Sequence, residues 1–153
     1  ISASLLIFSS LTVLLASGAG LAKAHCEIPC GIYGDDTRLS LLHEHITTIE
    51  KSMREIIKLS KAKQPNYNQL VRWVQNKDHH ASELSEIITY YFMAQRIKPP
   101  QQEGGEAHEK VQAQLGSLHR MLVYAMKAKQ TTDLGNVVEL RALLEAFEAS
   151  YLP

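Results

Sequence analysis

The chain has 153 residues, of which 45% are hydrophobic and 21% are charged, and this is the size and balance of one ordinary globular domain. Its 16 basic and 16 acidic residues cancel. The composition therefore offers no broad positive field that would recruit nucleic acid and no acidic tail. It predicts a single hydrophobic core.

The first 24 residues differ from the rest of the chain. Residues 5–16 are apolar, with only Ser and Thr as polar interruptions. A membrane-spanning helix needs about 20 apolar residues, whereas the apolar core of a signal peptide needs about 7 to 15. Residues 22–24, Ala-Lys-Ala, supply the small-x-small pattern of a cleavage site. We expect a signal peptide or processed leader that is cut before His25.

Cleavage at this point predicts an exported protein, in a periplasm, a lumen or the exterior, with no membrane association after cleavage. Two alternatives remain open at this point. The segment could stay attached as an anchor, or it could be a pro-segment removed from a cytoplasmic protein.

From residue 35 to residue 153, apolar residues recur at alternating spacings of three and four, which keeps them on one face of a helix. Breaks fall at residues 64–66 (Gln-Pro-Asn), at residues 99–105, which hold two prolines and two glycines, and at residues 131–135. Four helices result, and the first should run to about Lys63. Short connectors between such helices favour an all-α, antiparallel four-helix bundle.

The predicted core follows from the four apolar stripes, and its Met and aromatic residues are expected to fill the core rather than hold a cofactor. The core positions are Leu39, Leu42, Ile46, Ile49, Met53, Ile56 and Ser60; Leu70, Trp73, Val74, Ala81, Leu84, Ile87, Ile88, Tyr91 and Phe92; Val111, Leu115, Leu118, Leu122 and Ala125; and Val137, Leu140, Leu144, Phe147 and Tyr151.

Residues 25–34, called the hook below, fit no helix and hold both cysteines. If His25 is the first residue, its free amine and the backbone nitrogen of Cys26 close a five-membered ring on a metal. The backbone nitrogen and thiolate of Cys26 close another, and the amine and imidazole Nδ1 of His25 close a six-membered one. Cys30 can complete a plane, because Pro29 and Gly31 favour a tight turn.

A plane of two thiolates, an amine and a deprotonated amide suits Ni(II) or Cu(II), whereas zinc prefers tetrahedral surroundings. The imidazole of His25 would then be an axial ligand of the trivalent metal, with the opposite face open to a small molecule. On spacing alone, however, Cys26 and Cys30 could equally form a small disulfide in an exported protein.

The nine residues from His25 to Tyr33 resemble the amino-terminal hook of nickel superoxide dismutases, whose mature pattern is His-Cys-x-x-Pro-Cys-Gly-x-Tyr. Every fixed position matches. The resemblance implies a bundle over residues 35–153 and a nickel ion held by His25, Cys26 and Cys30. It also implies superoxide as the substrate and catalytic roles for His25 and Tyr33, with Tyr33 and Pro29 restricting access to the open face.

The resemblance is weaker for the residues that would surround the metal ligands. Family members hold the first imidazole with a carboxylate from the first helix, but Leu42 stands near that position, and Glu44 is the nearest acidic residue. An arginine of the second helix in some members corresponds to His80 here.

The other histidines give weaker signals. His79 and His80 are adjacent, and His43 and His45 are two apart, so the members of each pair should face different directions. The resemblance also implies a homohexamer, for which Trp73 and Tyr90 are candidate contacts.

Two other functions remain possible at this stage. A protein that binds nickel or copper without turnover would hold the metal but show no superoxide-dependent rate. A disulfide-closed helical interaction module would hold oxidised Cys26 and Cys30 and no metal. Tyr33 could also serve only to pack the hook against the bundle.

Overall fold

The computed structural model describes residues 34–100 and 103–152, and within these ranges the chain is helical. The leader and the hook through Tyr33 lie outside the described residues. The helices are α2 (Asp35–Ser60), α3 (Tyr67–Glu86), the π-helix η1 (Ile87–Arg96), α4 (Glu106–Gln130) and α5 (Gly135–Tyr151). No strand occurs in the part of the chain that the structure describes.

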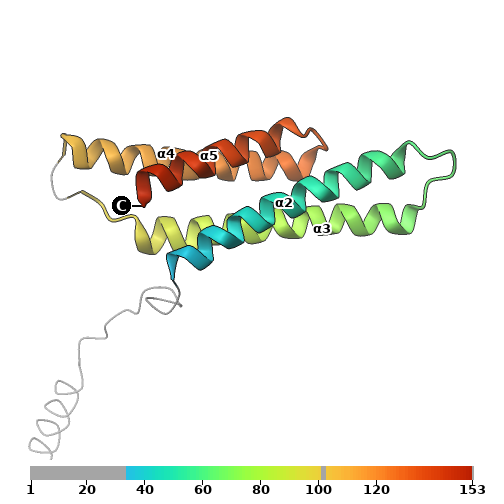
Figure 1. Cartoon of the computed structure of the whole chain (residues 1–153), viewed down its shortest axis with the longest axis horizontal. Coiled ribbons are helices and arrows are strands. Elements are labelled where there is room, and N and C mark those ends of the chain that lie inside the picture. The colour runs from blue at the N-terminus through green and yellow to red at the C-terminus, as the bar shows by residue number, and fades with distance from the viewer. Residues whose placement is uncertain (1–33, 101–102, 153) are drawn as a thin grey trace, which may run out of the picture.

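Consecutive helices run in opposite directions and pack into a bundle (Figure 1). α2 contacts α3, α3 contacts α4, α4 contacts α5, and α5 returns to α2. η1 continues α3 directly, so that the two count as one long helix. The predicted all-α, antiparallel four-helix bundle is confirmed.

Local sequence explains where the helices begin and end. Asp35 and Asp36 stand in the first turn of α2, where negative charge is favourable. Asn66 caps α3, because its side chain accepts a hydrogen bond of 3.1 Å from the backbone N–H of Gln69. α4 begins after Gly105, whose φ of 81° is one that glycine adopts most easily.

The core lies between the four helices and matches the predicted stripes closely. Its largest fully buried side chains are Phe92, Phe147, Leu42, Ile46, Ile49, Met53, Leu84, Ile88, Leu118, Met121, Leu140 and Leu144. The rings of Phe92 and Phe147 meet edge to face, with centroids 5.1 Å apart. This aromatic contact joins η1 to α5.

The predicted core was wrong at Ser60, which is exposed because α2 ends at that residue. Seven other predicted core positions are only partly buried: Leu70, Trp73, Val74, Val111, Leu115, Leu122 and Tyr151. The expected extension of the first helix to Lys63 was also wrong.

The second predicted helix contains an unexpected change of winding. Over η1 the backbone takes the wider π form, and its last bond runs from the N–H of Ile97 to the carbonyl of Phe92, five residues back, at 2.9 Å. π-helices are rare and occur often at functional sites. The residues that η1 presents are therefore of interest for the site.

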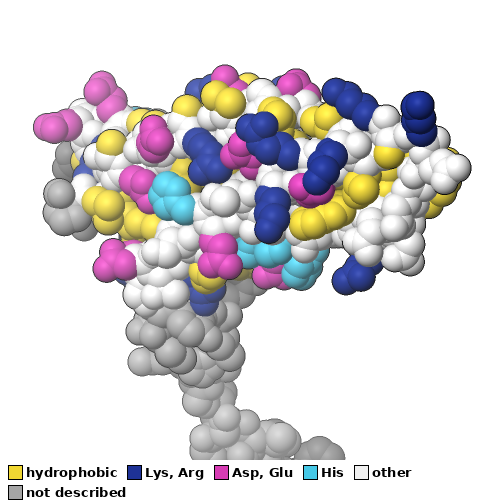
Figure 2. Space-filling view, turned by 45° about the vertical axis from the view of Figure 1, so that its right-hand side comes forward, with side chains coloured by type: hydrophobic (Ala, Val, Ile, Leu, Met, Phe, Trp, Pro, Cys, Tyr) yellow, Lys and Arg dark blue, Asp and Glu magenta, His cyan; other side chains and the backbone are white. Residues whose placement is uncertain are grey.

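The surface is mixed in charge. On the face shown in Figure 2, Lys and Arg side chains are interspersed with Asp and Glu, in agreement with a sequence that holds 16 residues of each sign. Among the described helices, none is both long enough and apolar enough to cross a membrane.

Candidate metal site and the end of the bundle that carries it

The predicted site residues, His25, Cys26, Cys30 and Tyr33, lie outside the described residues. The chain has two cysteines, and both belong to this segment. Within residues 34–100 and 103–152, no group of three or more His, Cys, Asp or Glu side chains could hold a metal ion. The described bundle therefore offers no competing metal centre, and thiolate ligands can come only from the hook.

The hook joins the bundle at Asp35, and the side chain of this residue is the centre of a polar network. The hydroxyl of Tyr91 donates a 2.6 Å hydrogen bond to Oδ1 of Asp35. Oδ2 accepts one from Nη2 of Arg96 at 2.7 Å and one from the hydroxyl of Tyr151 at 2.8 Å. We call these four residues the Asp35 network. It joins the start of α2 to η1 and to the last residue of α5, three segments that meet at one end of the bundle (Figure 1).

The contacts within the Asp35 network favour an ionised Asp35 and protonated tyrosines. Burial acts to raise the pKa of Asp35, but the hydrogen bonds from Arg96, Tyr91 and Tyr151 outweigh it and hold that pKa below its ordinary value. Burial and the carboxylate raise the pKa of Tyr91 to about 12. Burial also raises the pKa of Tyr151. The carboxylate therefore stays ionised and both tyrosines stay protonated near neutral pH, so the network is a fixed structural joint rather than a source of protons.

A second polar contact joins α2 to α3. Nδ1 of His45 lies 2.8 Å from Nδ1 of His80, and the ring centroids are 5.1 Å apart. The centroid distance equals the nitrogen–nitrogen distance plus about one ring radius at each end, so the two rings meet head-on. That geometry fits one shared proton, whereas a metal requires both lone pairs to converge on a common point.

Burial, and then the neighbouring imidazole, lowers the pKa of His45, and burial chiefly lowers that of His80. Both rings are thus favoured in the neutral form. His43 faces the other way and makes a 2.8 Å contact with Glu148 on α5, which confirms that His43 and His45 diverge. Sequence reasoning missed the pairing of His45 with His80, because the two lie 35 residues apart.

The positions considered as supports for the first imidazole have other roles in the bundle. Leu42 is fully buried in the core and has no polar group to offer. Glu44 is exposed on the surface of α2. His80 is already bonded to His45.

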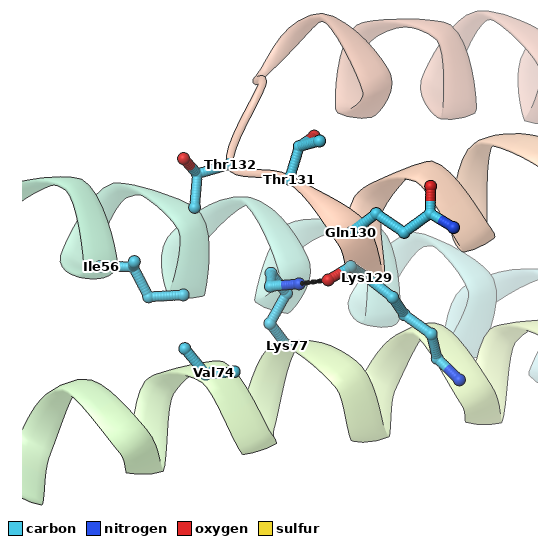
Figure 3. Close-up of a pocket in the computed structure, with 7 residues that line it drawn as sticks. All are labelled: Ile56, Val74, Lys77, Lys129, Gln130, Thr131 and Thr132. Carbon is cyan, nitrogen blue, oxygen red and sulfur yellow. Dashed lines mark hydrogen bonds between the residues drawn. The ribbon is translucent and has the colours of Figure 1, made fainter.

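A pocket of about 450 Å³ opens at the far end of the bundle, between α2, α3 and the end of α4 (Figure 3). Lys77 reaches its wall and donates to the backbone carbonyls of Ala128 and Lys129, both at 2.6 Å. Its ammonium is 2.9 Å from the carboxylate of Asp78. The charge of Lys77 is thus used to cap α4, and the pocket presents no free catalytic group from this side chain.

The described residues form a small α-helical bundle, and both cysteines of the chain precede its first helix. Over residues 21–153 the chain matches the model of the nickel-containing superoxide dismutase family, and it belongs to that family. It is therefore an oxidoreductase with a nickel cofactor. No curated protein and no solved structure matched the chain.

Proposed function

We propose that the mature protein begins at His25 and disproportionates superoxide into oxygen and hydrogen peroxide at a nickel ion held by the hook. The observation that carries the proposal is the His-Cys-x-x-Pro-Cys-Gly-x-Tyr pattern over His25 to Tyr33, which lies inside the stretch that matches the family. In this proposal His25 gives its amine and imidazole, Cys26 its amide nitrogen and thiolate, and Cys30 its thiolate.

The chemistry of these donors fits nickel. Two thiolates and an amidate are strong anionic donors, which would suit divalent nickel and would also stabilise its oxidised form. A nickel ion held by these residues would supply the redox chemistry, as a divalent and trivalent pair. Removal of the leader matters to this donor set, because only a terminal His25 has a free amine.

The rest of the chain holds the hook and admits the substrate. Tyr33 restricts access to the open face of the site and is one candidate route for protons, beside the hook amides and water. A signal peptide over residues 1–24 would export the protein to a periplasm, a lumen or the exterior. Family membership supports assembly as a homohexamer, to which the exposed side chain of Tyr90 could contribute.

The first test is the amino-terminal residue and the metal content of the protein purified from its own source. We expect a chain that starts at His25 and holds nickel. An active protein that begins upstream of His25 would rule out the amine as a ligand. A nickel-loaded protein without superoxide-dependent turnover would favour the non-catalytic metal-binding alternative.

The second test is His25→Ala in the mature chain, which separates metal capture from catalysis. The variant keeps the amine, the amide and both thiolates, so the plane of donors should still bind nickel. It loses the imidazole of His25, so superoxide decay in pulse radiolysis should slow and the trivalent spectroscopic signal should change. Undiminished decay at full nickel content would show that the imidazole has no catalytic role.

A further inference from the structure

We propose that Asp35, Tyr91, Arg96 and Tyr151 are positioning residues for the nickel site, because they fix the first residue of α2, to which the hook is joined through Gly34. The inference rests on the proposed function of the hook. Tyr33, the last residue of the hook motif, is only two positions before Asp35 in the chain. Whatever fixes Asp35 therefore fixes the origin of the metal-binding segment.

The Asp35 network restrains the start of α2 through side-chain hydrogen bonds. Gly34, the residue that precedes the helix, has no side chain with which to cap it, and a Cβ added there would meet nothing within 4 Å. Aspartate at the start of a helix commonly satisfies the N–H groups of its own helix. Asp35 instead accepts three hydrogen bonds from η1 and α5, so its carboxylate joins α2 to two other segments.

The winding of η1 explains how two donors from one helix reach the same carboxylate. Tyr91 and Arg96 are five residues apart, and in an α-helix such residues point about 140° away from each other. In a π-helix the hydrogen bond spans five residues, so residues at this spacing lie on the same face of the helix. The unusual π winding of Ile87–Arg96 thus presents both side chains to Asp35.

Tyr151 and two arginines complete the surroundings of Asp35 and Tyr91. Tyr151 comes from the last turn of α5, and its ring stacks on Phe147 with centroids 5.1 Å apart. Arg38 and Arg96 lie over the ring of Tyr91, with guanidinium carbons 5.4 and 5.6 Å from its centroid. Contacts on the ring of Tyr91 therefore help to hold its hydroxyl beside Asp35.

Fixing the start of α2 should matter more for the imidazole of His25 than for the other proposed nickel donors. The planar donors lie within six consecutive residues and can form around the metal without help from the bundle. The imidazole of His25 and the side chain of Tyr33 must instead be placed relative to the protein that surrounds the open face. Weakening the Asp35 network should therefore leave nickel bound and disturb the placement of the His25 imidazole and the access route.

The test compares the mature wild-type chain with Tyr91→Phe, Tyr151→Phe and the double variant. Each change removes one hydroxyl and keeps the ring in the core. Tyr124→Phe on α4 is the matched control, since its hydroxyl has no hydrogen-bond partner among the described residues. Four quantities are measured: the stability of the nickel-free protein, nickel content, the spectroscopic signal of trivalent nickel, and superoxide decay.

For the double variant we expect near-normal nickel content, an altered nitrogen splitting in the trivalent signal, and superoxide decay slower by up to about a hundredfold, the effect that a misplacement of about 1 Å can have. The single variants should fall between it and the control. A merely structural network would lower stability but leave the signal and the rate per nickel unchanged, and that result in the folded single variants would overturn the inference.

The two proposals fail in different ways. A wild-type chain that binds no nickel, or binds it without turnover, contradicts the proposed function before any variant is made. A wild-type chain that is active, with network variants that match Tyr124→Phe in signal and rate, contradicts only the positioning role.

Discussion

Lys77 is the clearest case in which a single side chain supports the bundle away from the proposed site. Its side chain is 3% exposed, and its ammonium bonds the carbonyls of Ala128 and Lys129 at the end of α4. The last four carbonyls of a helix have no partner within the helix. The carbonyl of Lys127 accepts the N–H of Thr131, so Lys77 satisfies the next two.

We expect Lys77→Met to lower the free energy of unfolding by about 2–4 kcal/mol. Hydrogen bonds that involve a charged group contribute about 1.5–3 kcal/mol each, and Lys77 makes two of them, one buried and one partly buried, to backbone carbonyls. Methionine keeps the apolar stem and avoids the cost of burying an ammonium, which offsets part of the loss. The net effect should be smaller than the two bonds taken together.

The measurement is urea unfolding of the nickel-free mature protein, with a transition midpoint that shifts at an unchanged slope. Lys129→Met is the control, because it removes an exposed ammonium at the same pocket and should change stability by no more than about 0.5 kcal/mol. Nickel content and turnover of folded Lys77→Met should equal those of the wild type. A loss of stability no larger than that of the control would refute the capping role.

Three further predictions concern the pair of histidines, the core and the hook. The pKa values of His45 and His80 lie below the ordinary 6.5 in the folded protein, so as pH falls the unfolded chain takes up protons at a higher pH than the folded chain does. The stability of the nickel-free protein should therefore fall as pH drops below 6.5. Equal urea midpoints at about pH 7.5 and 5.5 would contradict this. Phe147→Ala, at a fully buried ring, should cost about 3–5 kcal/mol in the same unfolding assay, and a cost below about 1 kcal/mol would be incompatible with the packing. Cys26→Ser or Cys30→Ser should abolish nickel-dependent activity with normal helical circular dichroism, whereas unfolding of both variants would favour the disulfide alternative.

The fold was predictable because helix formation and burial leave a regular trace in the sequence. The apolar stripes gave the four helices and most of the core. They did not reveal η1, since a broad stripe at Ile87, Ile88, Tyr91 and Phe92 fits a wide α-helical face as well as a π-helix. The spacing of five between Ile87 and Phe92 is the one signal that could have shown it.

Lys77 was missed for a different physical reason. A lysine within a helix is ordinarily solvated, and its sequence neighbours give no sign that it is buried. Its partners, the carbonyls at the end of α4, lie 51 and 52 residues further along the chain. Only the packing of α3 against α4 creates the need for a cation at this position.

The proposed metal ligands are close together in sequence, whereas the residues of the Asp35 network are brought together only by folding. His25, Cys26 and Cys30 are close in sequence, so their chelate rings can be counted from the order of the residues alone. The partners of Asp35 are 56, 61 and 116 residues away from it, and no local pattern connects them. A chelate formed by consecutive residues can capture nickel whatever lies behind it, but it has no fixed orientation relative to the protein. The orientation must come from contacts that exist only in the folded bundle. That difference is why variants of the Asp35 network should alter the signal of the bound metal while its content stays near normal.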